Sequence, residues 1–480
     1  MHEKIERVSA VPSVSYSITV RLEVPAGGTS VSQLTTAVEQ AGGAVTALDV
    51  TASGHERLRI DVTCAARDTE HADQLVEAMR AVPGVSVGKV SDRTFLMHLG
   101  GKIAMHSKHP IRNRDELSMV YTPGVARVCL AIAKNPEDAR RLTIKRNSIA
   151  VVTDGSAVLG LGNIGPKAAL PVMEGKAALF KRFADIDAWP ICLDTQDTEQ
   201  IIEVVRVLAP GFAGINLEDI SAPRCFEVER RLRELLDIPV FHDDQHGTAI
   251  VVVGALTNAL RVVNKDIAQV RIVMSGAGAA GTAIIKLLLA AGAENVVVGD
   301  IDGVIHRGRS GLSGELAWLA EHTNALGFTG SLKQAVADAD VFIGVSAPGV
   351  LTGDDVATMA DRAIVFALAN PEPEVDPAEA ARYAAVVATG RSDFPNQINN
   401  VLAFPGVFRG LLDAHSSEIT SAMLLAAARA LAGVVTDGEL NANYIMPSVF
   451  HAKVHETVAA AVRRAAGGPA ELPIETEAVG

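Results

Sequence analysis

The sequence predicts an α/β protein made of several domains, with parallel sheets in its larger part. Three observations support this class. Residues 14 to about 97 alternate strand-like and helix-like stretches in the order β-α-β-β-α-β. Two later strand-like runs end in neighbouring carboxylates, and a third runs directly into a glycine-rich turn before an apolar helix. A chain of 480 residues is long enough for roughly two to four such domains.

Composition excludes several classes of partner and location. Hydrophobic residues make up 48% of the chain, yet no uninterrupted apolar run reaches the roughly 18 residues of a membrane span, so no membrane partner is expected. The N-terminus lacks the apolar core of a secretory signal. A net charge of −13 argues against nucleic acid as a partner. The four cysteines are scattered without a CxxC pair, which predicts reduced thiols and a cytoplasmic location.

Residues 1–97 are predicted to form a unit of their own. Strands are expected over 14–22, 45–51, 58–62 and 85–96, and helices over 31–42 and 69–82. Gly27 and Gly28 mark the turn from the first strand to the first helix. This order is the ferredoxin-like one, and it resembles the ACT domain, a regulatory module that often binds amino acids at a paired interface. A structural or dimerising appendage is the alternative.

Residues 98–247 contain the first candidates for chemistry. Tyr121 stands just before a Pro-Gly turn with a helix predicted beyond it, which would hold its ring in place, although a lone tyrosine is usually packing. Lys176 lies in a predicted helix among Ala, Leu and Phe. Desolvation there would lower its pKa and make it usable as a base, whereas surface lysines are the commoner case. A GxGxxG match at 160–165 carries little weight, because a second match lies in a better structural context.

Acidic residues follow two successive predicted strands in this domain. Glu218 and Asp219 come after the strand at 214–217, and Asp243 and Asp244 come after the next one. Because the carboxyl ends of neighbouring parallel strands meet at one crevice, these acids are expected to converge. Glu218, Asp219 and Asp244, with water and substrate oxygens, suit an octahedral Mg²⁺ or Mn²⁺ site. A solvated turn that caps the following helix is the alternative for the Asp-Asp pair alone, and the second acidic pair favours the cation site.

Residues 248–398 are predicted to form a Rossmann-type, doubly wound dinucleotide domain. A strand at 270–275 runs into a glycine turn that opens an apolar helix, and the next strand ends at Asp300. About 20 residues separate the last glycine from this acid, the spacing at which a carboxylate meets the adenosine ribose. Later strands end in residues suited to line a nicotinamide pocket. The expected dinucleotide contacts are Gly276, Gly278, Ala279, Ala280, Gly281, Asp300, Ser346 and Asn370.

These features together predict a dinucleotide enzyme that acts on a hydroxy acid. A metal that chelates a 2-hydroxy acid polarises its C2 oxygen, and a lysine can take the hydroxyl proton as hydride leaves for the nicotinamide. A metal is also useful when a β-keto acid then loses CO₂, because it stabilises the enolate that forms. A tyrosine would protonate that enolate at C3.

The chain resembles malic enzymes, specifically the short bacterial type, over roughly residues 98–465. The resemblance rests on Tyr-Thr-Pro-Gly at 121–124, Gly-Leu-Gly-Asn-Ile-Gly at 160–165, the run from Pro171 to Lys176, Glu-Asp at 218–219, the run from His242 to Ala249, and Asn-Asn at 399–400 ahead of Phe-Pro-Gly. It implies oxidative decarboxylation of L-malate to pyruvate and CO₂ with NAD⁺, or alternatively NADP⁺, and with Mg²⁺ or Mn²⁺.

The same resemblance assigns roles to single residues. Lys176 is the base, Tyr121 the acid, and Asp243 the support of the lysine. The implied metal ligands are Glu218, Asp219 and Asp244, and the implied substrate contacts are Asn370, Asn399 and Asn400. The final segment, 399–480, is expected to be helical and to fold back onto the substrate domain.

One position departs from the family pattern. Longer malic enzymes carry an arginine before the first glycine loop that grips a malate carboxylate, and Ala157 stands in its place here. The grip is therefore expected from elsewhere, for example from a partner subunit in a homodimer or larger homo-oligomer.

Alternatives to the whole interpretation are a malolactic-type or non-decarboxylating malate dehydrogenase, or an ACT-type sensor with a degenerate catalytic body. An amino acid or another metabolite is the expected effector of residues 1–97.

Overall fold

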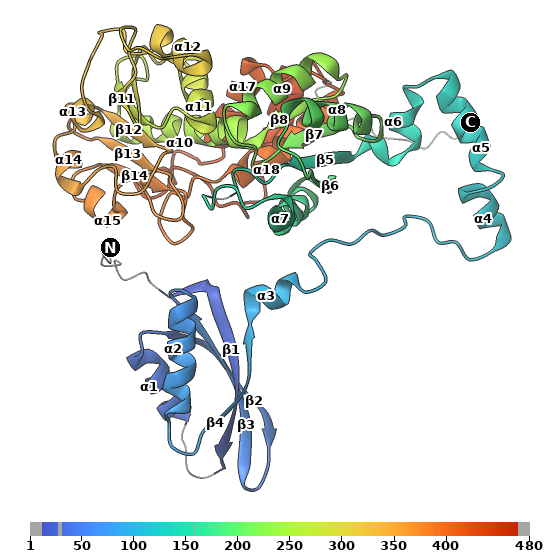
Figure 1. Cartoon of the computed structure of the whole chain (residues 1–480), viewed down its shortest axis with the longest axis vertical. Coiled ribbons are helices and arrows are strands. Elements are labelled where there is room, and N and C mark those ends of the chain that lie inside the picture. The colour runs from blue at the N-terminus through green and yellow to red at the C-terminus, as the bar shows by residue number, and fades with distance from the viewer. Residues whose placement is uncertain (1–11, 27–30, 159, 469–480) are drawn as a thin grey trace. The chain divides into compact units, whose positions relative to one another are not determined.

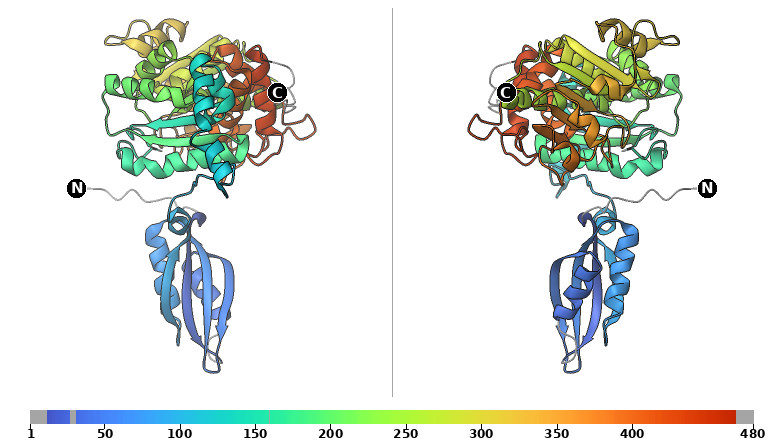
Figure 2. Two further views of the ribbon diagram at one scale, coloured as in Figure 1. Left: turned by 90° about the vertical axis from the view of Figure 1, so that its right-hand side faces the viewer. Right: turned by 90° about the vertical axis from the view of Figure 1, so that its left-hand side faces the viewer.

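The computed structural model describes residues 12–26, 31–158 and 160–468, and it divides into two compact units, Met1–Met105 and His106–Gly480 (Figure 1). The first unit is a four-stranded antiparallel sheet of order β2-β3-β1-β4, with two helices on one face (Figure 2). Its elements are β1 (Ser13–Pro25), α1 (Val31–Gln40), β2 (Ala44–Ser53), β3 (Arg57–Ala66), α2 (Thr69–Arg80), β4 (Ser86–Asp92) and α3 (Arg93–His98).

The element order of this unit is the one the sequence predicts, and alternation explains its core. Every second residue of β1 from Ile18 to Val24 is buried against the two helices, while Arg21 on the opposite face pairs with Asp61 of β3 at 2.7 Å. The prediction was wrong at 93–96, which is the helix α3 and not the end of a strand. Asp92 accepts a hydrogen bond from Phe95 N at 3.0 Å, and this N-cap starts the helix.

The second unit begins with short helices and a parallel sheet of order β6-β5-β7-β8. Helices lie on both of its faces, so the strands β5 and β7 are buried throughout. Its elements are α4 (Arg114–Val120), α5 (Val125–Lys134), α6 (Asp138–Leu142), η1 (Ile144–Arg146), β5 (Ser148–Thr153), α7 (Pro166–Ala184), β6 (Asp187–Cys192), α8 (Thr198–Leu208), η2 (Ala209–Gly211), β7 (Gly214–Leu217), α9 (Arg224–Leu235) and β8 (Val240–His242).

A second sheet follows in the same unit, with strand order β11-β10-β9-β12-β13-β14. All neighbours are parallel except β11, and the order reverses between β9 and β12, where doubly wound folds bind their ligands. Its elements are η3 (Asp243–Gly247), α10 (Thr248–Val263), β9 (Arg271–Ser275), α11 (Ala279–Ala290), β10 (Asn295–Asp300), β11 (Gly303–Val304), α12 (Gly314–His322), α13 (Leu332–Val336), β12 (Val341–Gly344), α14 (Gly353–Ala357), β13 (Ile364–Ala367), α15 (Pro377–Ala380) and β14 (Val386–Thr389).

The chain then returns to the first parallel sheet through η4 (Asn400–Leu402), α16 (Phe404–Ala414), α17 (Ser421–Ala432) and α18 (Val454–Ala465). Both α16 and α18 pack on α7. Phe180 of α7 meets Phe404 and Phe408 edge to face, with ring centroids 4.7 and 5.3 Å apart. The predicted return of the final helices onto the substrate domain is therefore observed.

Two segments of the described chain, Arg114–Lys134 and Asp243–Val263, are long and apolar enough to cross a membrane by length and composition alone. The second contains α10, whose residues are mostly buried between α11 and α17, as in the core helix of a globular protein. The first buries none of its residues within the unit. Length and composition are weak evidence for a span in both cases.

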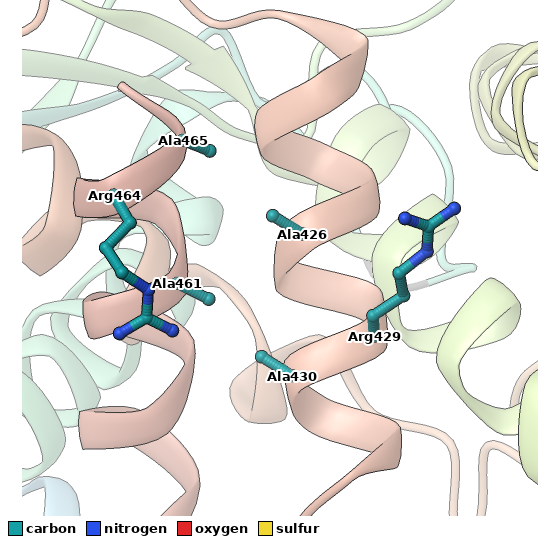
Figure 3. A pocket seen from close by; sticks show the side chains of 6 residues that line it. All are labelled: Ala426, Arg429, Ala430, Ala461, Arg464 and Ala465. Carbon is teal, nitrogen blue, oxygen red and sulfur yellow. The ribbon is translucent and has the colours of Figure 1, made fainter. Parts of the chain in front are cut away.

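A groove of about 550 Å³ runs along the contact of α17 with α18 (Figure 3). Four alanines form its floor, and an arginine from each helix lies at its side: Ala426, Arg429, Ala430, Ala461, Arg464 and Ala465. None of the residues expected to bind substrate, cation or dinucleotide lines this groove, so the groove is not part of the predicted active site.

Candidate active site

The structure brings three of the predicted acids together at the carboxyl ends of β7 and β8. Glu218, Asp219 and Asp244 each offer an oxygen, and these oxygens lie within 4.8 Å of one another. The backbone N–H of Asp219 donates to Asp244 Oδ2 at 3.0 Å, which ties the two strand ends to each other. Asp219 has a positive φ of 54°, an uncommon conformation that turns its side chain at the end of the strand.

The charge of this cluster fits a divalent cation. Burial, more than any other effect, holds the pKa of Glu218 well above its usual value, and the charges of Asp244, Asp243 and Asp219 add to this rise. The positive charge of Lys176 lowers the pKa but offsets only part of it. Protein groups alone thus supply too little positive charge for these carboxylates. Hard oxygen donors in this number are the ligands that Mg²⁺ and Mn²⁺ prefer, so the residues present suit such an ion.

Lys176 lies beside these acids and is itself buried. Its Nζ lies 2.5 Å from Asp243 Oδ2 and 2.9 Å from Glu218 Oε1, and 4.1 Å from the centre of the Phe404 ring. The predicted support of the lysine by Asp243 is thus present in the geometry. The predicted direction of its pKa was wrong: burial lowers the pKa of Lys176, but the charges of Asp243 and Glu218 outweigh burial and raise it above its usual value.

The predicted asparagines divide into two groups. Asn400 belongs to the cluster, because its Nδ2 donates to Asp243 Oδ2 at 3.1 Å. Asn399 instead caps η4 by accepting from Val401 N at 2.9 Å. Asn370 is exposed. Its backbone carbonyl oxygen lies so close to Gly160 that a Cβ on Gly160 would come within 2.6 Å of that oxygen. The glycine loop at 160–165 and the Asn370 loop therefore touch, and only glycine allows that approach.

Tyr121 is the predicted site residue that the geometry does not join to Lys176. It ends α4, and 66% of its surface is exposed. Within the described chain no hydrogen bond of its hydroxyl is present. The helices α4 and α5 bury none of their residues and expose large apolar side chains that include Met119 and Leu130. The sequence placed Tyr121 correctly at a turn, and its role as the acid stays a prediction.

The dinucleotide fingerprint has the expected backbone. Gly276 has a φ of 107°, and a Cβ on Gly281 would come within 2.0 Å of Gly276 O, so the turn before α11 requires glycine at both positions. Gly278 caps α11, which opens with Ala279 and Ala280, and its free N–H groups suit a pyrophosphate. Asp300 ends β10 and forms two hydrogen bonds of 2.8 Å with the Arg309 guanidinium.

Three charged residues near these sites were missed by the sequence analysis. Glu374 is fully buried and accepts from Ser346 N at 2.7 Å and from Ala369 N at 3.0 Å, which links the loops after β12 and β13. Arg224 donates to Asp154 at 2.7 Å and to Ser156 at 3.0 Å. Ser156 Oγ also accepts from Ser221 N at 2.9 Å, which connects this group to the loop after Asp219. Glu229 is the third, on the buried face of α9. A carboxylate at a helical position between apolar residues is the signal that could have found Glu229.

Comparison with known proteins agrees with this geometry. Residues 100–233 match the family described as malic enzyme, N-terminal domain, and residues 245–467 match malic enzyme, NAD binding domain. The chain is 57% identical over 450 residues to an NAD-dependent malic enzyme of Geobacillus stearothermophilus, covering 94% of each. It is 51% identical over 383 residues to a bifunctional malic/malolactic enzyme of Bacillus subtilis, covering 79% of this chain and 93% of that one.

Solved structures show the same similarity. An NAD-dependent malic enzyme from Thermotoga maritima is 48% identical and superposes with a TM-score of 0.75, covering 78% of this chain and 99% of that one. A malic enzyme from Pyrococcus horikoshii is 47% identical with a TM-score of 0.74, covering 76% of this chain and 87% of that one.

Proposed function

Because the chain belongs to the malic enzyme family, we infer that it catalyses the oxidative decarboxylation of L-malate to pyruvate and CO₂ with reduction of NAD⁺. The observation that carries this inference is the contact of Lys176 with Asp243 and Glu218 beside the three acids. The reaction needs a group that takes the C2 hydroxyl proton and a place for a divalent cation. Lys176 Nζ and the three acids meet at the carboxyl ends of β7 and β8.

The cation would be held by Glu218, Asp219 and Asp244, and it supplies charge stabilisation at the substrate's oxygens. Lys176 accepts the proton of the C2 hydroxyl while hydride leaves C2 for the nicotinamide. Asp243 holds the lysine nitrogen at 2.5 Å and is itself fixed by the Asn400 amide at 3.1 Å. The bond between C3 and the carboxylate then breaks, and CO₂ leaves an enolate of pyruvate.

Tyr121 donates the proton that this enolate takes at C3, a role that rests on the family resemblance of the Tyr-Thr-Pro-Gly motif. The tyrosine hydroxyl has to reach C3 of the enolate for this step, and the exposed apolar side chains of α4 and α5 support packing of these helices against another protein surface. Asn370 and Asn400 are the proposed substrate contacts. Asn399 supports them from its cap on η4.

NAD⁺ is the dinucleotide, and the ion pair of Asp300 with Arg309 supports the preference. The carboxylate can accept hydrogen bonds from the ribose hydroxyls, while Arg309 is engaged and is not available to a 2′-phosphate. Ser346 and the glycine turn at 276–281 are the proposed contacts to the rest of the cofactor.

The remaining parts of the proposal concern assembly, location and control. The exposed apolar surface of α4 and α5 supports a homodimer or larger homo-oligomer. All four cysteines are free, in keeping with a cytoplasmic protein. The first unit has its own buried core, and we propose that it binds an amino acid or another small metabolite as an ACT-like effector domain.

The activity is tested by mixing the full chain with L-malate, NAD⁺ and Mn²⁺ and measuring NADH and CO₂ together. Equal amounts of both are expected, and EDTA should abolish both. Similarity to a bifunctional malic/malolactic enzyme favours a second candidate, direct conversion of malate to lactate. Lactate formed without net NADH would support that reaction, whereas NADH formed without CO₂ would identify a non-decarboxylating dehydrogenase.

A further inference from the structure

The carboxylate of Glu229 lies buried behind the catalytic cluster. It belongs to α9, on the same face as Cys225, Val228 and Leu232, and only 5% of its surface is exposed. A charged side chain in such a place is rare without a specific set of partners, because burial of an unpaired charge is costly. The proposed mechanism gives Glu229 no part, so its partners indicate what it does.

All three hydrogen bonds of this carboxylate come from one short segment. His246 Nε2 lies 2.7 Å from Glu229 Oε1, Gln245 Nε2 donates to Oε2 at 3.1 Å, and the backbone N–H of His242 donates to Oε1 at 3.3 Å. The donors are spread over five consecutive residues, one at the end of β8 and two in η3. Glu229 therefore holds the whole turn from His242 to His246 against α9.

This turn determines where two neighbouring acids point. Asp243 and Asp244 are consecutive, yet Asp243 meets Lys176 and Asn400 while Asp244 meets the backbone of Asp219. The residues Asp243–Gly247 form a π-helical turn, a rare geometry that occurs mostly at functional sites. No side-chain hydrogen bond caps this turn at its N-terminus. Glu229 holds the turn through His242, Gln245 and His246, on the side opposite to the contacts that Asp243 and Asp244 make with Lys176, Asn400 and Asp219.

We propose that Glu229 is a positioning residue that fixes the His242–His246 turn, so that Asp244 faces the cation site while Asp243 stays on Lys176. The inference rests on the proposed function for its meaning, but it makes a prediction about cation binding that does not require turnover. Loss of the buried carboxylate should weaken cation binding, because Asp244 would no longer be held against Asp219. Dinucleotide binding should weaken less than cation binding, because Glu229 bonds the His242–His246 turn itself, whereas α11, which follows the glycine turn at Gly276, only packs on η3.

The test compares Glu229→Gln with Glu227→Gln in the full chain. Glutamine keeps the size of the side chain but removes its negative charge and one of its two acceptor oxygens, so the hydrogen bonds to the turn lose their charge-assisted acceptor. Glu227 lies on the same helix, but it is exposed to solvent and pairs with Arg231 at 3.4 Å, so it controls for the charge removed from α9. Mn²⁺ binding without malate is measured from the electron paramagnetic resonance signal of the free ion, and NADH binding is measured by fluorescence.

The expected result is a Kd for Mn²⁺ that rises about tenfold in Glu229→Gln, the size of a lost charge-assisted hydrogen bond, and is unchanged in Glu227→Gln. The Kd for NADH should stay the same in Glu227→Gln and should rise much less than the Kd for Mn²⁺ in Glu229→Gln. Gln245→Met removes one donor at similar volume and provides a milder second variant, for which we expect about a threefold rise. A graded loss over the two variants would support a positioning role.

Two outcomes would overturn the inference: an unchanged Kd for Mn²⁺ in the folded Glu229→Gln and Gln245→Met variants, or an equal loss of Mn²⁺ and NADH binding, which indicates general destabilisation. If Glu229→Gln does not fold, Gln245→Met decides by the same comparison. Failure of the proposed function is distinguishable from these results. In that case the wild-type chain would bind Mn²⁺ more tightly than Glu229→Gln and still form no NADH from malate.

Discussion

Replacing Lys176 with alanine removes the positive charge that touches both Asp243 and Glu218. The proton of the malate hydroxyl would then have no acceptor at the place where Lys176 Nζ lies. Positioned general bases contribute about 10²–10⁴-fold, so the rate of NADH formation from malate should fall by at least that range. Decarboxylation of supplied oxaloacetate depends on the cation and not on this base, so it should survive far better.

The same change should alter stability and cation binding. Without Lys176 the carboxylates of Asp243 and Glu218 lose their shared partner, and removing one member of a buried ion pair costs about 3–5 kcal/mol. A divalent cation can offset part of that charge. Thermal unfolding of Lys176→Ala should therefore shift upward with Mn²⁺ more strongly than that of the wild type.

The assay follows NADH absorbance with malate, and CO₂ release with oxaloacetate, for both proteins at saturating Mn²⁺. Lys176→Arg is the matched variant, because it keeps the charge but does not lose its proton at any accessible pH. It should preserve stability and abolish malate oxidation. If the two activities of Lys176→Ala fall equally while the protein stays folded, Lys176 is a structural residue and the assignment of the base is wrong.

Tyr121→Phe should lower kcat by about 10²–10⁴-fold with the fold intact, and an unchanged kcat would remove Tyr121 from the mechanism. Asp244→Asn should raise the Mn²⁺ concentration needed for activity while leaving NADH affinity intact, and loss of NADH binding instead would place it in the other pocket. Asp300→Ala should free Arg309 and raise kcat/KM for NADP⁺ relative to NAD⁺, and an unchanged ratio would show that this pair does not set specificity. Burial lowers the pKa of His455 to about 4, so unfolding stability should drop by about 2 kcal/mol between pH 7.5 and 5, as protons favour the unfolded chain, and His455→Phe should show no such drop.

Much of the site could be predicted because strand ends are a local feature. Glu218 and Asp244 each follow a buried strand, and parallel pairing of β7 with β8 brings those ends together, so the spacing along the chain was enough. The glycines at 276 and 281 are similar, since their backbone leaves no room for a Cβ. These are consequences of strand pairing in one sheet and of a tight turn after a strand of the other, and hydrophobic periodicity and glycine placement indicate both directly.

Other parts depend on packing between distant segments and were not predictable. The sequence shows Glu229 at a helical position between apolar residues, but its hydrogen-bond partners appear only when α9 packs against β8. The helix α3 begins because Asp92 caps it, while hydrophobic alternation favoured a strand there. Tyr121 lies at a predicted turn, but where its ring acts depends on what covers α4 and α5.

The pKa of Lys176 shows why a side chain cannot be assessed from its sequence neighbours alone. Those neighbours are apolar, and burial among them does lower the pKa, as expected. The sequence could not indicate that Asp243 and Glu218, which lie 67 and 42 positions later, would both contact the ammonium and reverse the direction of the pKa shift.

Glu218 is also one of the three acids that could hold a cation. A cation there would compete with Lys176 for the same carboxylate and repel its charge, and both effects lower the pKa of the lysine. Glu218 both contacts Lys176 and belongs to the cation site. The neutral form of Lys176, which can accept a proton, therefore depends on occupancy of the cation site.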